Sequence, residues 1–89
     1  MSMEVRSTAD LYPVVEDLIL RLKRDGATRL AAILDHRMHK VAWTSASELL
    51  EELRAVLANA VQNKEPLTPE SEAQVAQVIT DICSLLNKR

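Results

Sequence analysis

The sequence predicts an all-α fold, either a small antiparallel four-helix bundle or a pair of helical hairpins. Four segments carry apolar residues at steps of three and four, which places them on one side of an α-helix. The 89 residues include one Gly and three Pro, too few for the tight turns of an all-β fold. With no Phe, one Trp and one Tyr, the core must consist of aliphatic side chains and Met. A chain of this length predicts one helical domain over residues 1–89.

We expect the first helix over residues 10–24. Pro13 decides its start, because a proline inside a helix removes a hydrogen bond and clashes with the carbonyl group four residues earlier. With Asp10 as the N-cap, Pro13 occupies the third helical position, where its N–H would be unpaired anyway. Residues 1–8 then form an N-terminal arm. A start at Ser7 or Thr8 is the alternative and would require a kink.

The second helix is expected over residues 27–38. It follows Gly26, a residue type that readily takes the left-handed conformation after a helix end. Arg37 lies near the inner face, so we expect the helix to end close to it and the guanidinium to reach water. The connector that follows contains Trp43, which we expect to pack as a lid over one end of the bundle.

The third and fourth helices are expected over residues 45–63 and 68–87. Ser45 and Glu48 have the spacing of a capping box. Thr68 and Pro69 supply an N-cap and a proline at the first helical position, and Glu70 adds an acid to the first turn. These two helices are longer than the first two, so their apolar stripes should project unless a second copy covers them. We therefore expect a homodimer, with the candidate self-contact residues Leu50, Leu57, Val75, Ile79 and Cys83.

The charge is distributed unevenly. Residues 21–40 carry six basic side chains against two carboxylates, a local charge of +4, and residues 41–87 carry seven carboxylates against two basic side chains, a local charge of −5. The simplest interpretation is that two halves of one bundle attract each other and keep solvated faces. The alternative is a basic surface for nucleic acid or an acidic partner, made of Arg21, Lys23, Arg24, Arg29, Arg37 and Lys40.

The same segment allows a helix-turn-helix interpretation, with Gly26 as the turn and Thr28 and Arg29 at the start of a recognition helix. Asp25 in the turn and the acidic remainder of the chain argue against nucleic-acid binding. Another alternative is a small regulator or inhibitor of the immunity or antitoxin type. Its acidic third helix, through Glu48, Glu51 and Glu52, would cover a basic site on a target.

The sequence predicts no enzymatic activity, no cofactor and no metal. Nucleophilic catalysis needs a nucleophile beside an oriented base, and the two histidines, His36 and His39, share one short segment. Together with Asp35 their spacing could hold a metal, but no second cluster of ligands exists in the sequence, and we favour histidines at a helix end. Cys83 lies on an apolar helix, where a thiol is an inert packing group.

A single cysteine cannot form an internal disulfide, which fits a reducing compartment. No apolar run approaches the roughly 18 residues that a membrane-spanning helix needs, and residues 1–6 lack the apolar core of a signal peptide. We expect a cytoplasmic protein.

The run from Trp43 to Arg54 and the segment from Leu67 to Glu70 resemble small bacterial all-helical proteins of uncharacterised function. The resemblance rests on leucine spacing and helix caps and covers most of the chain. It implies a helical fold and no catalytic residue, cofactor or substrate.

Overall fold

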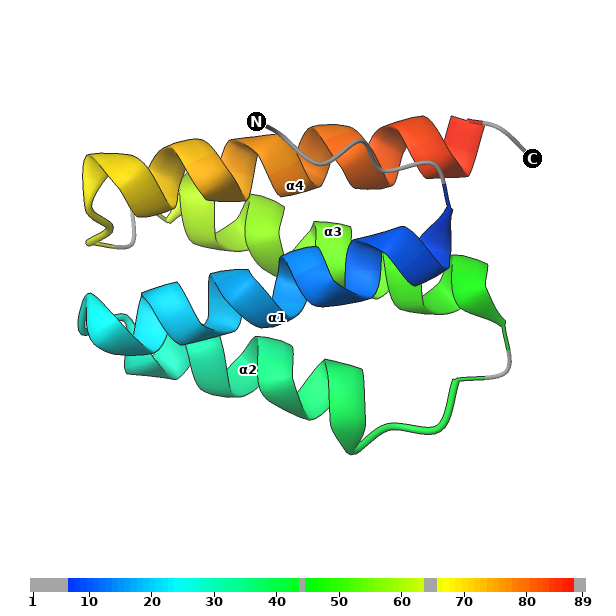
Figure 1. Cartoon of the computed structure of the whole chain (residues 1–89), viewed down its shortest axis with the longest axis horizontal. Coiled ribbons are helices and arrows are strands. Elements are labelled where there is room, and N and C mark those ends of the chain that lie inside the picture. Colours follow the sequence, from blue (N-terminus) through cyan, green and yellow to red (C-terminus); the bar gives the residue numbers. More distant parts are fainter. Residues whose placement is uncertain (1–6, 44, 64–65, 88–89) are drawn as a thin grey trace.

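The structure is a computed structural model that describes residues 7–43, 45–63 and 66–87. These residues form four α-helices: α1 (Thr8–Arg24), α2 (Thr28–His39), α3 (Ala46–Gln62) and α4 (Pro69–Asn87). Consecutive helices run antiparallel, and α4 packs back against α1, so that each helix has two main neighbours (Figure 1). The predicted all-α antiparallel bundle is confirmed. Residues 1–6 of the expected N-terminal arm lie outside the described residues.

The four helices share one apolar core. Aliphatic side chains from every helix are buried in it, while Met38 and Trp43 pack against its edge. The core contains Leu11, Val15, Leu18, Ile19, Leu22, Leu30, Ala31, Leu34, Leu49, Leu50, Leu53, Leu57, Ala60, Val75, Val78, Ile82 and Leu85.

The expected start of the first helix at Asp10 is wrong, because α1 begins at Thr8. Ser7 is its N-cap, with extended backbone angles and a side-chain oxygen that accepts from the Asp10 N–H at 3.3 Å. Pro13 therefore lies inside the helix, at the sixth position. Pro13 has no N–H to donate to the carbonyl group of Ala9, four residues earlier. Ala9 is exposed near the helix end, so water can donate to this carbonyl group instead.

The prediction that Gly26 ends the first helix is confirmed. Its φ is +91°, a left-handed conformation that favours glycine. The Ala27 N–H donates to the Leu22 carbonyl at 2.8 Å, and the Gly26 N–H donates to the Lys23 carbonyl at 3.3 Å. This pair of bonds is a Schellman motif, which turns the chain directly into α2.

Asp25, just before this glycine, joins the end of α1 to the start of α4. Its Oδ2 accepts from the Thr68 Oγ1 at 2.8 Å and from the fully buried Ser71 Oγ at 2.5 Å. Thr68 also accepts from the Ser71 N–H at 3.2 Å, which confirms it as the N-cap of α4. The two hydroxyl donors, with smaller help from Arg21 and Arg24, hold the pKa of Asp25 below its ordinary value of 3.8.

This cluster predicts a loss of stability in acid. Because the folded-state pKa of Asp25 is depressed, its contribution is present above the unfolded-state pKa of about 3.9 and is lost as the pH falls through the folded-state value. We expect Ser71→Ala to be less stable than wild type at neutral pH. This difference should shrink below about pH 4, as urea denaturation at several pH values would show. A constant difference would contradict a role for the charged carboxylate.

Candidate functional site

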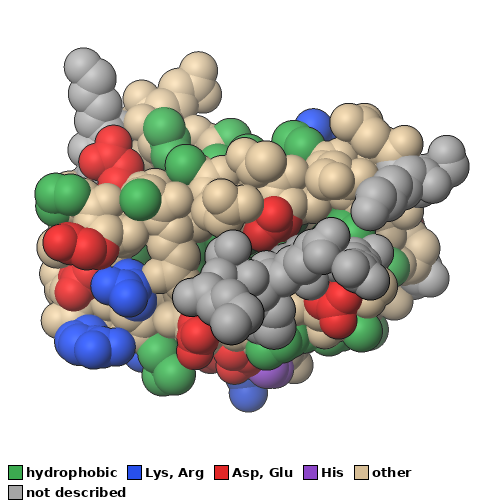
Figure 2. Space-filling view, turned by 45° about the horizontal axis from the view of Figure 1, so that its top comes forward, with side chains coloured by type: hydrophobic (Ala, Val, Ile, Leu, Met, Phe, Trp, Pro, Cys, Tyr) green, Lys and Arg blue, Asp and Glu red, His purple; other side chains and the backbone are tan. Residues whose placement is uncertain are grey.

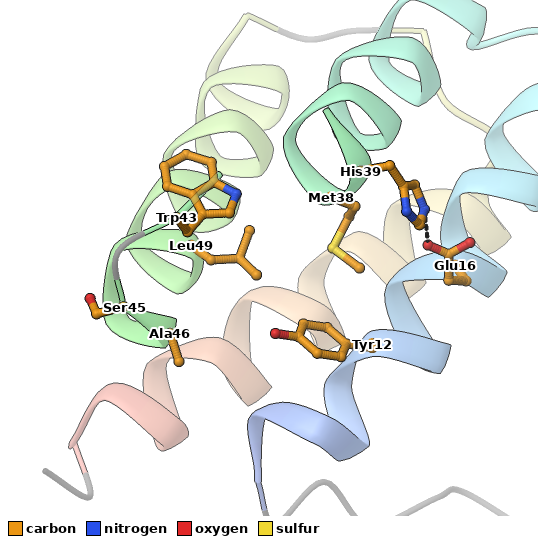
Figure 3. Close-up of a pocket in the computed structure, with 8 residues that line it drawn as sticks. All are labelled: Tyr12, Glu16, Met38, His39, Trp43, Ser45, Ala46 and Leu49. Carbon is orange, nitrogen blue, oxygen red and sulfur yellow. Dashed lines mark hydrogen bonds and ion pairs between the residues drawn. The ribbon is translucent and has the colours of Figure 1, made fainter. Parts of the chain in front are cut away.

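The main hollow lies where the C-terminus of α2 and the N-terminus of α3 border the first half of α1. It is an open groove with a volume of about 650 Å³. Three helices and the α2–α3 connector supply its walls (Figure 3). The lining residues are Tyr12, Glu16, Met38, His39, Trp43, Ser45, Ala46 and Leu49.

The groove holds both aromatic side chains of the chain, which has one Trp, one Tyr and no Phe. Tyr12 is 41% exposed, and Trp43 is half-buried and packed against the core. In Figure 3, Trp43 and Leu49 lie on one side, Tyr12 on another, and the thioether of Met38 points into the space between them. Aromatic and Met side chains that line a concave site are typical of surfaces that bind other molecules.

Trp43 is held in place by the helix that precedes it. Its indole Nε1 donates to the carbonyl oxygen of Arg37 at 2.7 Å. The side chain of Arg37 in turn donates through Nε to Glu52 at 3.0 Å, which joins α2 to α3. The expected packing of Trp43 over the bundle end is therefore confirmed. The Arg37 guanidinium, which was expected to reach water, pairs with the Glu52 carboxylate. The helix α2 ends two residues after Arg37, at His39, close to the expected position.

A contact between His39 and Glu16 forms the other edge of the groove. The Nε2 of His39, at the end of α2, lies 2.5 Å from an oxygen of Glu16 on α1. Asp35, one turn earlier on α2, lies 3.7 Å from the same nitrogen. The imidazole thus meets carboxylates from two helices, and Figure 3 shows His39 and Glu16 facing each other.

Ser45 contributes the start of α3 to the groove wall. Its Oγ accepts from the Glu48 N–H at 3.2 Å, so the hydroxyl is used as an N-cap, as the capping-box spacing predicted. Glu51 and Glu48 are exposed, while Glu52 is half-buried against Arg37. The first turns of α3, which carry Glu48, Glu51 and Glu52, thus lie beside the groove.

The carboxylates outnumber the cations around this end of the bundle. Carboxylates occur on the first half of α1, on the last turns of α2 and on the first turns of α3. Arg37, paired with Glu52, and Lys40 are the cations of these described segments. The carboxylates are Asp10, Glu16, Asp17, Asp35, Glu48, Glu51 and Glu52.

The predicted self-contact surface is wrong for three of its five residues. Leu50, Leu57 and Val75 are buried inside the chain, whereas Ile79 and Cys83 are half-buried. The expectation that the first helix is shorter than the third is also wrong, because α1 starts at Thr8 and has 17 residues, as many as α3. As expected, α2 is shorter, with 12 residues. α1 packs against α4 and α2 against α3.

The six residues of the predicted basic surface do not come together. Arg21, Lys23, Arg24 and Arg29 lie near the α1–α2 turn, with Arg21 half-buried and the others exposed. Lys40 follows the far end of α2, about 17 Å away along the helix axis. On the face in Figure 2, Lys and Arg side chains gather at the left, next to Asp and Glu.

The helix-turn-helix alternative gains no support from the helix geometry. The first two helices lie antiparallel and pack along their lengths (Figure 1), whereas a DNA-binding pair crosses at a steep angle. Arg29 lies in the first turn of α2 beside the antiparallel α1. An αα-hairpin closed by a C-capping glycine accounts for this segment.

The two histidines do not share a site. Only His39 faces carboxylates, while the Nδ1 of His36 lies 2.9 Å from the Arg37 Nη1. Across residues 7–43, 45–63 and 66–87, no group of three or more His, Cys, Asp or Glu side chains is arranged to hold a metal ion. None of the four described helices has the length and apolar character needed to cross a bilayer.

A second, smaller hollow of about 340 Å³ lies between α2 and α3. Its walls are more polar than those of the groove, and the side chain of Arg37 forms part of them. The lining residues are Arg29, Leu30, Ile33, Arg37, Val56, Asn59, Ala60 and Asn63.

The chain matches no protein-family model, and no significant similarity connects it to a curated protein or a solved structure. Sequence reasoning missed the groove, because Tyr12, Met38 and Leu49 come from three helices whose relative positions no local pattern specifies. The available signal was the scarcity of aromatics, which made the positions of Tyr12 and Trp43 informative.

Proposed function

We propose that this protein is a non-catalytic interaction domain that holds a segment of a protein partner in the groove formed by α1, α2 and α3. The observation that carries the proposal is the meeting of Tyr12, Met38 and Trp43 around one open hollow. Exposed apolar surface costs free energy in water, and a concave patch rich in aromatic and Met side chains is typical of a protein interface.

The polar groups of the groove support binding rather than chemistry. Ser45 caps α3, His39 is paired with Glu16, and the indole N–H of Trp43 is bound to a backbone carbonyl. Each of these groups already has a role in holding helices or their ends. A bound segment would therefore be recognised mainly through its apolar side chains and its charge.

The test is a comparison of two variants on one helix. Tyr12→Ala removes an aromatic ring from the groove, and Leu20→Ala removes an apolar side chain that is 60% exposed and does not line it. We expect a partner captured by wild type from a lysate of the source cells to be lost with Tyr12→Ala and kept with Leu20→Ala, as mass spectrometry would show. Equal capture by both variants would contradict the proposal.

Self-association is a second candidate function, and the outer side of the α3–α4 pair favours it. The exposed positions of α3 after Arg54 and of α4 after Glu72 carry no charged side chain among the described residues, and the half-buried Asp81, which accepts from Gln77, is the carboxylate of this part of α4. They include Val61, which is 46% exposed. Charge depletion is a feature of interface cores. The exposed positions are Ala55, Ala58, Asn59, Val61, Gln62, Ala73, Ala76, Gln77, Thr80, Ser84 and Asn87.

We expect Val61→Glu to shift a homodimer towards monomer, because it adds a charge to this charge-poor surface. Leu20→Glu, on the outer side of α1, should leave the assembly unchanged. Sedimentation equilibrium over a range of concentrations measures both effects. A wild-type chain that stays monomeric at every concentration would remove the homodimer.

A further inference from the structure

We infer that the partner segment is a basic amphipathic helix, which places its apolar side chains in the groove and its Lys or Arg side chains against the acidic rims. This inference rests on the proposed function and names the chemistry of its partner. Three features of the site support it: its shape, the charge on both of its edges and the hydrogen bonds that hold its walls.

The shape of the site suits a helix better than an enclosed small molecule. The hollow is open along one side, between the end of α2, the connector and the start of α3. Tyr12 and Met38 reach it from two helices and Trp43 reaches it from the connector, which spreads apolar surface over three points. A helix that presents side chains at every third and fourth position can contact such points together.

The charge of the rims selects a cationic partner. Glu16 and Asp35 flank His39 on the α1–α2 edge, and Glu48 lies in the first turn of α3 on the opposite edge. In the helix segments around the groove, the described carboxylates outnumber the cations Arg37 and Lys40. Complementary potentials steer association and exclude partners of like charge.

The walls are fixed before binding. Trp43 is bonded to the Arg37 carbonyl, Arg37 to Glu52, and His39 to Glu16. Less side-chain freedom is therefore lost when a partner binds, and preorganisation of this kind favours affinity.

The test uses synthetic peptides and the fluorescence of Trp43, the single tryptophan of the chain. The first peptide is a helix of about four turns with leucine at every third and fourth position and lysine elsewhere. The second replaces lysine with glutamate, and the third replaces leucine with alanine. We expect the first peptide to bind at least about tenfold more tightly than either of the others. Its affinity should fall several-fold when salt rises from about 50 to about 500 mM.

Variants of the protein locate the binding. Tyr12→Ala should weaken the lysine peptide by about tenfold, whereas Leu20→Ala should leave its affinity unchanged. Glu16→Gln keeps an acceptor for His39 but removes one rim charge, so it should weaken binding about threefold and reduce the salt dependence. Glu72→Gln, at the opposite end of the bundle, is the matched control. Circular dichroism checks that each variant is folded.

Each other outcome overturns the inference in a distinct way. Equal binding of the lysine and glutamate peptides would remove the charge preference. A Trp43 signal that changes on dilution of the protein alone would identify a second copy as the occupant. Absence of peptide binding would also reject the basic helix. The proposed function would still stand if Tyr12→Ala loses the lysate partner, and would fail with the inference if that partner is retained.

Discussion

Replacing Val75 with Asp is expected to unfold the chain. Val75 has no exposed surface and lies in the core between helices. A carboxylate at this position must either lose its hydration without a partner or take up a proton, and each costs several kcal/mol. A domain of this size has a stability of about 5–10 kcal/mol, so little would remain. Far-ultraviolet circular dichroism and thermal melting measure the loss.

Ala76→Asp is the matched control, because Ala76 is the next residue of α4 and is exposed. We expect this variant to keep its helical signal and to melt close to the wild-type temperature. The pair also decides between two views of Val75. A Val75→Asp chain that stays folded and changes only its oligomeric state would restore Val75 as a self-contact residue.

Leu53→Ala is expected to lower the free energy of unfolding by about 3 kcal/mol. Leu53 is fully buried on α3, so truncation removes apolar contacts and leaves a cavity. Its neighbours cannot close this cavity completely, because packed helices relax only in part. Urea denaturation measures the change as a shift of the midpoint at constant slope.

Leu20→Ala provides the comparison, since it makes the same chemical change at a leucine that is 60% exposed. We expect a change within about 0.5 kcal/mol of wild type. Similar losses for the two variants would show that Leu20 is covered in solution, as it would be at a contact with another molecule.

The helices themselves could be predicted from local patterns. Ser45 caps α3, Thr68 caps α4 and Gly26 closes α1, and in each case the residue type and its neighbours were sufficient. A helix cap is a contact between residues that are close in the chain, so the local sequence is sufficient to predict it. The apolar stripes also identified the core faces, since helical periodicity depends on spacing alone.

The wrong predictions concern the start of the first helix and the residues that were expected to be exposed. Pro13 favoured a start at Asp10, but Ser7 supplied a working cap three residues earlier. This longer α1 packs against α4, and Leu50 and Val75, which were expected at a self-contact surface, are buried in the shared core. The groove could not be predicted, because its walls depend on how far the ends of α2 and α3 lie from α1.

Arg37 connects the groove to the smaller hollow between α2 and α3. Its backbone carbonyl holds the indole beside the large groove, and its side chain lines the smaller hollow and binds Glu52. Displacement of the indole by an occupant would therefore reach the α2–α3 seam through a single residue. Nuclear magnetic resonance signals of Val56 and Asn59, which line only the smaller hollow, would then report on events at the opposite end of the same seam.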